Sequence, residues 1–563
     1  MHHDCVKDSI LKNLSVRNEW FIKVILLSII FLFILTAFLL ALMPPIARDA
    51  LIHHLAIPKL WIRHGGFYEM PWAEYSYYPM NVDLLYWIPL YFGNDIIPNF
   101  IHLGFGLSTA AIIYCYLRWR FNAIAGLLGF LIFISTPVIS KLSTMAYVDL
   151  GLVFFVTVSV LAFIRWRAGE YKKYSWLLIS SVAMGLALGT KYNGLVAWFF
   201  MTLSIVFICS RDTGNSGRAV GYGLIFFIIS LAVFSPWLVK NTVLTGNPLY
   251  PLFPGLFNSH STDGGGSNAA AFGHMNYGMF KMREMLYGEN LWDILLIPFR
   301  MFYQGQDDVP RYFDGVLNPV LIIFVPFAFM KKDMKIENLF FLLFSIFFIL
   351  IALFLDQIRI RYVLPVIPFL AILSVTGLVN IFVWLTARKN ILREMCMAGL
   401  VIILLILFSI NVTYIQKYFQ KIEPVKYLIK KESRDDFIAR HVSSYPAIMY
   451  INRNTPEDSK IRLILLAGRG YYLNRTYQED RSLGMGMDLI RGMVDSSGDE
   501  ILFRRYLASL NCTHLLVRYD LFQQFLQDNY DMKKIEQLKK QMSRSLKTVY
   551  DDHRYIVFSV LRQ

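Results

Sequence analysis

The sequence has little cysteine and little charge for its length. Its 563 residues include five cysteines, and 17% of the residues are Asp, Glu, Lys or Arg. No CxxC pair and no Cys/His spacing suited to zinc occurs. Cys115, Cys209 and Cys396 fall within long apolar stretches, Cys5 lies near the N-terminus, and Cys512 alone belongs to the polar C-terminal part. The sequence therefore excludes a disulfide framework and a zinc domain.

Two other features are missing. No small-residue cleavage site follows the first apolar stretch, so this stretch is interpreted as a retained membrane span and not as a cleaved signal. No internal repeat is visible, which argues against a transporter built from duplicated halves.

Long apolar runs are abundant. Hydrophobic residues make up 56% of the chain, and the mean hydropathy is +0.46. A spanning helix needs about 20 mostly apolar residues. Eleven stretches satisfy this requirement, with the approximate bounds 21–43, 96–117, 121–138, 146–165, 174–190, 193–210, 219–239, 316–330, 338–355, 362–386 and 395–417. The sequence predicts a mainly α, polytopic membrane protein with about eleven spans.

The net charge of +15 is explained by the loops between the spans. Basic residues collect in the alternate short loops that begin near residues 118, 165, 211, 331 and 388. The opposite short loops carry only Lys141, Lys191, Arg359 and Arg361. Because positive loops face the cytoplasm, the N-terminus is predicted to be cytoplasmic, and an odd number of spans places the C-terminal part outside. The charge therefore indicates membrane orientation, and no nucleic-acid partner is expected.

The chain divides into three predicted parts. Residues 1–20 form a cytoplasmic tail, residues 21–417 form the transmembrane module, and residues 418–563 form a small α/β domain outside the membrane. In this domain the runs IRLILLAG, THLLVRYD and RYIVFSVL predict buried strands, and segments near 433–442 and 521–545 predict helices. Two outer loops, 44–95 and 240–315, are long enough to carry function. The first contains amphipathic stretches rich in Trp and Tyr, which are typical of helices lying in the membrane interface.

Asp49 is the first candidate for chemistry. It follows the first span in PPIARDALIHH. A carboxylate at the membrane face can act as a general base toward an acceptor hydroxyl or amine. The alternative is that Asp49 only caps the helix that begins at Ala50.

Other charged residues fall at the same predicted face. Asp149 lies just inside the outer end of the fourth span, where an ionisable group is costly; the alternative is a carboxylate stabilised by the helix macrodipole. Lys191, Arg359 and Arg361 are candidate phosphate ligands. Their alternatives are snorkelling of Lys191 to lipid headgroups and pairing of the arginines with Asp356 or lipid.

Three further polar residues lie on the first outer loop. His53 follows Asp49 by four residues and shares its helical face, and His54 and Lys59 are close in sequence. Asp49 and His53 are two candidate ligands of a divalent ion, but two ligands do not make a site. The alternative is a polar face on an interfacial helix. No metal site is assigned.

Four motifs occur in a fixed order along the chain: RDALIHHLAIPKL with Asp49, AYVDLGLVFF with Asp149, MGLALGTKYNG with Lys191, and RIRYVLPVIP with Arg361 and Tyr362. In this order and on one membrane face, they resemble the GT-C membrane glycosyltransferases that use lipid-phosphate sugars, which include the protein O-mannosyltransferases and the lipid A aminoarabinose transferases. The resemblance covers about residues 20–390.

The resemblance implies a glycosyltransferase of the bacterial inner membrane that serves the cell envelope. Its donor is a polyprenyl-phosphate sugar, and its acceptor is a lipid, glycan or protein at the periplasmic face. Asp49 takes the acceptor proton, and Lys191, Arg359 and Arg361 bind the leaving phosphate. Asp149 orients Asp49, a bound cation or the sugar hydroxyls. The acceptor attacks the anomeric carbon directly, so this carbon is inverted. Candidate substrate contacts are His53, His54, Lys59, Tyr362, His274 and Tyr277. No cofactor is assigned, and a divalent cation is left open because the family contains enzymes of both kinds.

The family's pattern is not matched everywhere. The first loop of the family commonly carries an Asp-Glu pair, whereas this chain has Asp49-Ala50. The C-terminal part also lacks the large repeated β domain of eukaryotic mannosyltransferases. The sequence leaves two alternatives open: a transporter or flippase of lipid-linked sugars, and an enzyme resembling O-antigen ligases or polymerases. The first is disfavoured by the lack of charges at the membrane midplane, and the second by the few arginines in the second outer loop.

Overall fold

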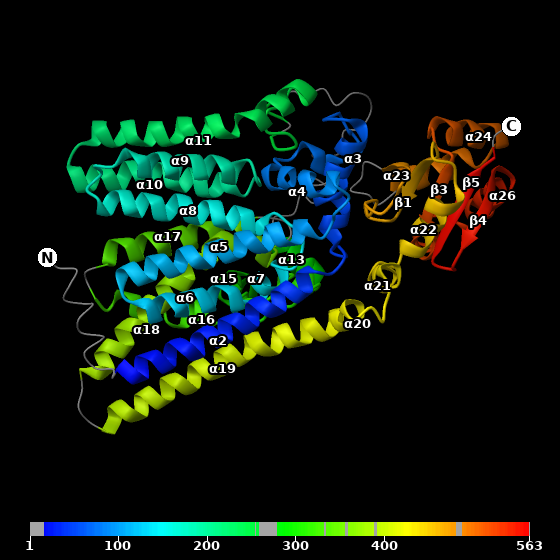
Figure 1. Ribbon diagram of the computed structural model, residues 1–563. Coiled ribbons are helices and arrows are strands. Elements are labelled where there is room, and N and C mark those ends of the chain that lie inside the picture. Colours follow the sequence, from blue (N-terminus) through cyan, green and yellow to red (C-terminus); the bar gives the residue numbers. More distant parts are fainter. Residues whose placement is uncertain are drawn as a thin grey trace.

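The computed structural model describes residues 16–253, 255–257, 279–331, 334–354, 358–387, 391–479 and 487–561. The fold is a bundle of long helices with a small mixed α/β unit at one end (Figure 1). The helices α2, α5, α8, α10, α11, α17, α18 and α19 form most of the bundle. Their bounds are Val16–Ala41, Ile97–Arg120, Asp149–Ala168, Gly194–Thr213, Ser216–Thr245, Lys335–Ala352, Ile367–Thr386 and Ile391–Ile422.

Eight segments of the described chain are long and apolar enough to cross a membrane. Three shorter apolar segments accompany them: α6 (Ala123–Ser135), α9 (Tyr174–Leu188), and α16 (Val320–Ile323) continued by η4 (Val325–Phe329). Together these segments correspond to the eleven predicted spans, so the predicted fold class is confirmed. The chain is an integral membrane protein with multiple spans.

Local sequence signals set the helix ends. The side chains of Asn122 and Asn215 accept hydrogen bonds from the first turns of α6 and α11. Gly214 and Gly246 end α10 and α11 in the left-handed conformation that glycine adopts most easily. These caps lie where apolar runs stop, so the sequence positions the spans to within a few residues.

The first outer loop covers one end of the bundle, which we call the site end. It contains η1 (Ala50–His54), a short π-helical turn, followed by α3 (Ala56–His64), η2 (Glu74–Tyr77) and α4 (Asn81–Tyr91). In Figure 1 these blue elements stand between the bundle and the C-terminal unit. The amphipathic stretches predicted for this loop are therefore helical. The short helix α7 (Pro137–Leu142) precedes α8 at the same end.

The described part of the second outer loop is also helical. Its elements are α13 (Met279–Tyr287), α14 (Leu291–Leu295), α15 (Ile297–Arg300) and η3 (Pro310–Tyr312). Arg283 and Arg300 both pair with the buried carboxylate of Glu289, at 2.7 and 3.0 Å. This double ion pair holds α13 against α14 and α15. The candidate contacts His274 and Tyr277 lie outside the described residues.

The C-terminal unit contains one sheet of five strands in the order β2-β1-β3-β5-β4. Strand β1 pairs in parallel with β2 and β3, whereas β5 pairs antiparallel with β3 and β4. The strands are Lys460–Ile464, Thr476–Glu479, His514–Arg518, Leu546–Asp551 and Tyr555–Val560. Helices α20 to α26 precede and surround the sheet, with the bounds Pro424–Leu428, Arg434–His441, Tyr445–Asn454, Met487–Ser496, Glu500–Ser509, Tyr519–Asn529 and Met532–Ser545.

Hydrogen bonds join the C-terminal unit to the site end of the bundle. The Tyr472 hydroxyl donates to the Pro45 carbonyl at 2.6 Å. Lys59 on α3 donates to the carbonyl of Tyr471 at 2.7 Å. Arg434 pairs with Asp95, which precedes α5, at 2.6 Å. Helix α19 runs past the predicted boundary at residue 417 and ends at Ile422, and the exact division into domains stays a prediction.

Candidate active site

Asp49 and Arg361 form an ion pair at the site end of the bundle. Asp49 precedes η1, and Arg361 belongs to η5 (Ile360–Val366), the short helical turn before α18. The Asp49 side chain makes no capping hydrogen bond with η1. Its carboxylate therefore faces the cation from the distant segment, and the capping alternative does not describe it.

Asp149 and Lys191 form the second ion pair. Asp149 is the first residue of α8, and Lys191 lies in the turn between α9 and α10. The ammonium donates to Asp149 Oδ1 at 2.7 Å, and the aspartate side chain is only 2% exposed. The other oxygen, Oδ2, is buried without a hydrogen-bond partner among the described residues. Lys191 thus turns toward a carboxylate and keeps it charged in a buried position.

Tyr362 contacts both ion pairs, and Tyr147 contacts the Asp49–Arg361 pair. The Tyr362 ring lies 5.5 Å from the Lys191 ammonium and 5.6 Å from the Arg361 guanidinium. Tyr147 lies 5.9 Å from the same guanidinium, and its hydroxyl accepts a hydrogen bond from the Asp49 backbone N–H at 3.3 Å. Both cations therefore lie against the face of one aromatic ring, an arrangement that favours positive charge.

Asp83 was not identified from the sequence, yet it lies within the site. Its carboxyl group shares a hydrogen bond of 2.7 Å with His54 Nδ1, and its side chain is 1% exposed. The His54 ring packs 4.0 Å from His53 and 5.5 Å from Tyr147. A third acidic residue is thus joined to the turn that carries Asp49. The only sequence signal for Asp83 is a single carboxylate in the apolar stretch DLLYWIPLYF. Because this stretch has no clear polar face, the sequence does not show that Asp83 is directed into the site.

Burial and charge act in opposite directions on Asp49. Burial raises the pKa of its carboxyl group, but Arg361, His53 and His54 outweigh burial and hold the pKa below its ordinary value. Burial also lowers the pKa of His54 to about 3, although Asp49 and Asp149 raise it. Burial raises the pKa of Asp83 well above its ordinary value. At neutral pH the site therefore holds an ionised Asp49 beside a neutral His54, and burial favours the protonated form of Asp83.

The structure places two other predicted residues away from these pairs. Arg359 lies 3.8 Å from Asp314 of the second outer loop. Lys59 is directed to the C-terminal unit, where it donates to the Tyr471 carbonyl. Among the described residues, no three His, Cys, Asp or Glu side chains gather in a group that would hold a metal ion. The sequence assigns no divalent cation, and the reaction proposed for this site uses none.

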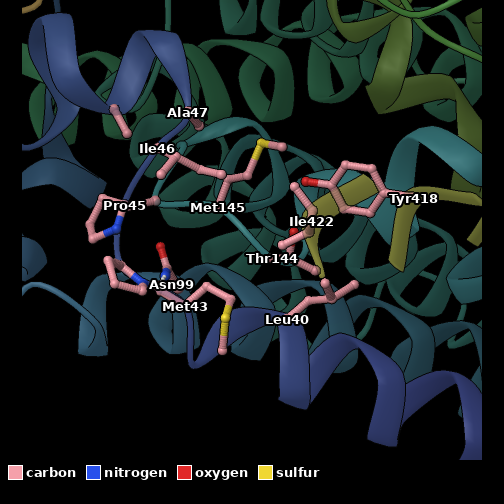
Figure 2. Close-up of a pocket in the computed structure, with 13 residues that line it drawn as sticks. Leu40, Met43, Pro45, Ile46, Ala47, Asn99, Thr144, Met145, Tyr418 and Ile422 are labelled. Atoms are coloured by element: carbon pink, nitrogen blue, oxygen red, sulfur yellow. Dashed lines mark hydrogen bonds between the residues drawn. The ribbon is translucent and has the colours of Figure 1, made fainter. Parts of the chain in front are cut away.

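A largely apolar cavity adjoins Asp49. Figure 2 shows its lining side chains, which come from the end of α2, the 43–47 segment, the connection between α7 and α8, and the end of α19. Ala47 and Ala50, on either side of Asp49 in sequence, both contribute. Asn99 donates to the carbonyls of Ala41 and Met43 at 3.1 Å, which fixes the chain where α2 ends. The apolar lining of this cavity therefore extends to the residues on either side of Asp49.

Comparisons with known proteins identify similar chains. Residues 88–244 match the model of the family described as dolichyl-phosphate-mannose-protein mannosyltransferase. ArnT from Cupriavidus metallidurans in the apo state has a TM-score of 0.55 at 14% identity, over 98% of this chain and 100% of that chain. The same protein bound to undecaprenyl phosphate has a TM-score of 0.55 at 13% identity, over 96% and 98%.

A third solved structure is an oligosaccharyltransferase from Archaeoglobus fulgidus in the apo form. Its TM-score is 0.50 at 13% identity, over 97% of this chain and 75% of that chain. No curated protein sequence matches the chain. The solved structures therefore share the fold over nearly the whole chain, including the C-terminal unit.

Proposed function

We propose that this chain, a GT-C membrane glycosyltransferase that depends on a polyprenyl-phosphate sugar, transfers the sugar to an acceptor on the extracytoplasmic face of a bacterial inner membrane. The family match over residues 88–244 and the shared fold confirm the predicted resemblance to this enzyme type. The membrane face, the acceptor and the stereochemistry are parts of this proposal.

The roles proposed for the site residues rest on one observation. Four segments that are far apart in sequence bring two carboxylates and two cations to one end of the bundle, as the pairs Asp49–Arg361 and Asp149–Lys191. A sugar phosphate needs cations at the leaving oxygen and a base at the acceptor. The two pairs supply both groups, and the ArnT structure with undecaprenyl phosphate shows that the same fold accepts such a lipid.

In the proposed reaction, Arg361 and Lys191 bind the donor phosphate through charge-assisted hydrogen bonds. The acceptor oxygen or nitrogen attacks the anomeric carbon as the bond from that carbon to the phosphate oxygen breaks. The electron pair passes to the phosphate, whose charge the two cations offset. Asp49 takes the acceptor proton. A single displacement of this kind inverts the anomeric carbon.

The pairing of Asp49 with Arg361 also suggests how the base is activated. Arg361 lowers the pKa of Asp49 when no donor is bound, so the carboxylate is then a weak base. When the donor phosphate takes part of the Arg361 hydrogen bonding, this effect weakens and Asp49 becomes more basic. Asp149 keeps Lys191 directed toward the same place, which makes Asp149 a positioning residue in this proposal.

Orientation is proposed from the charges of the loops. The basic last turns of α5, α8 and α10 lie at the end of the bundle opposite the site (Figure 1). Because positive loops face the cytoplasm, this supports the proposal that this end is cytoplasmic. The first outer loop and the C-terminal unit would then lie outside, together with the acceptor. Arg359 is left out of the proposed phosphate site because it lies beside Asp314.

The test is transfer by the full chain in detergent. A panel of polyprenyl-phosphate sugars is supplied with a crude envelope acceptor, and Asp49→Asn is assayed beside the native protein. Loss of a general base should lower turnover by at least about 100-fold. Asp308→Asn is the matched control, because Asp308 is an exposed carboxylate of the second outer loop. Substantial turnover in Asp49→Asn would remove Asp49 as the base.

A further inference from the structure

A row of tyrosine rings stands beside the two ion pairs. Tyr75, in η2, stacks on His53 with ring centroids 4.3 Å apart and 19° between the planes. Tyr78 lies 5.6 Å from Tyr75, and Tyr192 lies 5.3 Å from Tyr78. We call Tyr75, Tyr78 and Tyr192 the tyrosine wall. The catalytic roles proposed above use none of these three residues.

The tyrosine wall begins at the charged site. The electrostatic neighbours of Tyr75 include Asp49, Tyr362 and Arg361. Tyr78 also has Tyr362 among its neighbours. Tyr362 is the ring that contacts both Lys191 and Arg361. A group attached to a phosphate held by these two cations would therefore lie close to the tyrosine wall.

Tyr75 offers an aromatic face to a ligand. The residue is 37% exposed, whereas Tyr192 and Tyr77 are buried. Because His53 covers one face of the Tyr75 ring, the opposite face is the one available. Tyrosine combines an apolar ring with a polar hydroxyl, which suits a ligand that has both kinds of surface. A sugar ring is such a ligand, since its C–H groups form an apolar face and its hydroxyls form a polar edge.

Glu74 adds a hydrogen-bond acceptor next to this face. Its side chain is partly buried, and burial raises the pKa of its carboxyl group. Within the residues that the structure describes, no donor or cation pairs with this carboxylate. Partly buried polar groups usually have partners. A carboxylate has two oxygens and accepts hydrogen bonds from two neighbouring hydroxyls at once.

We propose that Tyr75, Tyr78 and Glu74 form the subsite for the donor sugar ring. Tyr75 stacks on the apolar face of the ring, Tyr78 closes the side of the subsite, and Glu74 accepts hydrogen bonds from two adjacent hydroxyls. The inference rests on the proposed function, because it takes the donor phosphate to lie at Lys191 and Arg361. It also names a ligand class: a sugar with two neighbouring free hydroxyls.

The experiment measures binding and not transfer. The full chain in detergent is titrated with undecaprenyl phosphate and with hexosyl and pentosyl forms of the same lipid. The native protein should bind at least one sugar-bearing lipid about tenfold more tightly than the bare lipid, which corresponds to about 1.4 kcal/mol. Tyr75→Leu and Glu74→Gln should each reduce this preference at least about threefold while leaving the affinity for the bare lipid unchanged.

Two further variants complete the test. Tyr75→Phe keeps the ring and should keep the preference. Tyr91→Leu is the matched control, because Tyr91 is an exposed tyrosine of α4 whose ring contacts Phe92 and not the tyrosine wall. Unchanged binding of the bare lipid also shows that each variant is folded.

The outcomes separate this inference from the proposed function. A full preference in Tyr75→Leu, an equal loss of both affinities, or no preference in the native protein for any sugar-bearing lipid would each overturn the sugar subsite. If the native protein prefers a sugar-bearing lipid in the expected way but transfers no sugar to any acceptor, the subsite is supported and the proposed transfer reaction fails.

Discussion

The two ends of helix α8 use acidic residues in opposite ways. At the far end from the site, Asp212 of α10 accepts hydrogen bonds from Arg167 Nε at 2.7 Å, Arg167 Nη2 at 3.4 Å and the Tyr171 hydroxyl at 2.7 Å. At the site end, Asp149 accepts one from Lys191, and its Oδ2 is buried without a partner among the described residues. Both oxygens of Asp212 therefore accept hydrogen bonds, whereas Oδ2 of Asp149 can still accept one.

A second acidic residue at the far end, Glu337 of α17, is also bonded through both carboxylate oxygens. Glu337 of α17 binds Arg120 through one oxygen and the Tyr116 hydroxyl through the other, at 2.8 Å for the latter. In the described part of the chain, buried nitrogens without a partner occur at both ends: Arg361 Nε and His53 Nδ1 at the site end, and Arg120 Nε and Trp166 Nε1 at the far end. A buried polar group without a partner costs about 1–3 kcal/mol. The two ends therefore differ in their carboxylates, because Asp149 keeps an unbonded oxygen that a ligand can satisfy, whereas both oxygens of Glu337 are bonded.

Replacing Asp149 and Asp212 with asparagine, one at a time, tests the difference between the two ends most directly. Asp149→Asn removes the charge that directs Lys191 and should lower turnover by about 100-fold, comparable to the loss of a well-positioned catalytic group. Asp212→Asn should leave turnover within about twofold and lower the thermal unfolding midpoint, because it breaks a structural ion pair. Transfer assays and unfolding curves on both variants are the measurements. Equal loss of activity in both would remove the distinction between the ends.

Removing the cation at the site end should weaken donor binding, whereas removing the cation at the far end should not. Lys191→Ala is expected to weaken donor binding at least about tenfold, because a charge-assisted hydrogen bond contributes about 1.5–3 kcal/mol. Arg167→Ala should leave donor binding unchanged, since its guanidinium pairs with Asp212. Titration with undecaprenyl phosphate measures both. An unchanged affinity in Lys191→Ala would mean that this lysine serves only to pair Asp149.

The sequence located most of this asymmetry through the positions of charges relative to apolar runs. Asp49, Asp149, Lys191 and Arg361 all fall within a few residues of span ends, where an ionisable group stands out. Asp83 and the tyrosine wall were not predicted. The helices of the first outer loop are too short to show a hydrophobic periodicity that would separate buried from exposed faces. Their roles depend on contacts between η1, η2 and α4 that only the folded loop shows.

The two arginines near residue 360 show a second limit. Arg359 and Arg361 are equivalent in sequence, both basic and both at the predicted outer face. The chain is extended at Arg359 and enters η5 at Ile360, so the two side chains reach different partners, Asp314 and Asp49. A change of backbone conformation within two residues is not visible in composition or periodicity.

The C-terminal unit was predicted in outline. The three central strands of the sheet, β1, β3 and β5, fall in the runs IRLILLAG, THLLVRYD and RYIVFSVL, except that β1 begins one residue earlier, at Lys460. The two edge strands, β2 and β4, were missed because edge strands are less apolar and read like exposed segments. The single helix expected over 521–545 is two helices, α25 and α26, since Tyr530 is extended and Asp531 caps the second helix.

The His54–Asp83 pair allows a finer test of the site end. Burial raises the pKa of Asp83 and so favours the protonated acid as the partner of His54, and an asparagine side chain can also donate to Nδ1. Asp83→Asn should therefore keep turnover within about threefold. Asp83→Leu leaves His54 without its partner and should lower turnover about tenfold, in line with the loss of one buried hydrogen bond. Equal loss in both variants would show that Asp83 acts as a charged group.

The smallest expected effect concerns the seam between the site end and the C-terminal unit. Lys59 donates to carbonyl and amide oxygens there and has no carboxylate partner in the described chain. Burial, with help from Arg63, lowers the pKa of Lys59 from 10.5 to about 7, although Asp95 raises it. Below pH 7 the lysine is protonated whether or not the seam is closed, so pH has no effect through this group.

Above pH 7 the open seam binds more protons at Lys59 than the closed seam does, so closing becomes more favourable as pH rises toward 10.5. Hydrogen-exchange protection of α3 and of residues 471–474 should therefore increase between pH 7 and 9, after correction for the intrinsic exchange rate. Protection at the Arg167–Asp212 end should not change, because that contact joins groups that stay charged over this range. Lys59→Met should abolish the increase at the seam, and a persisting increase would mean that another group controls docking.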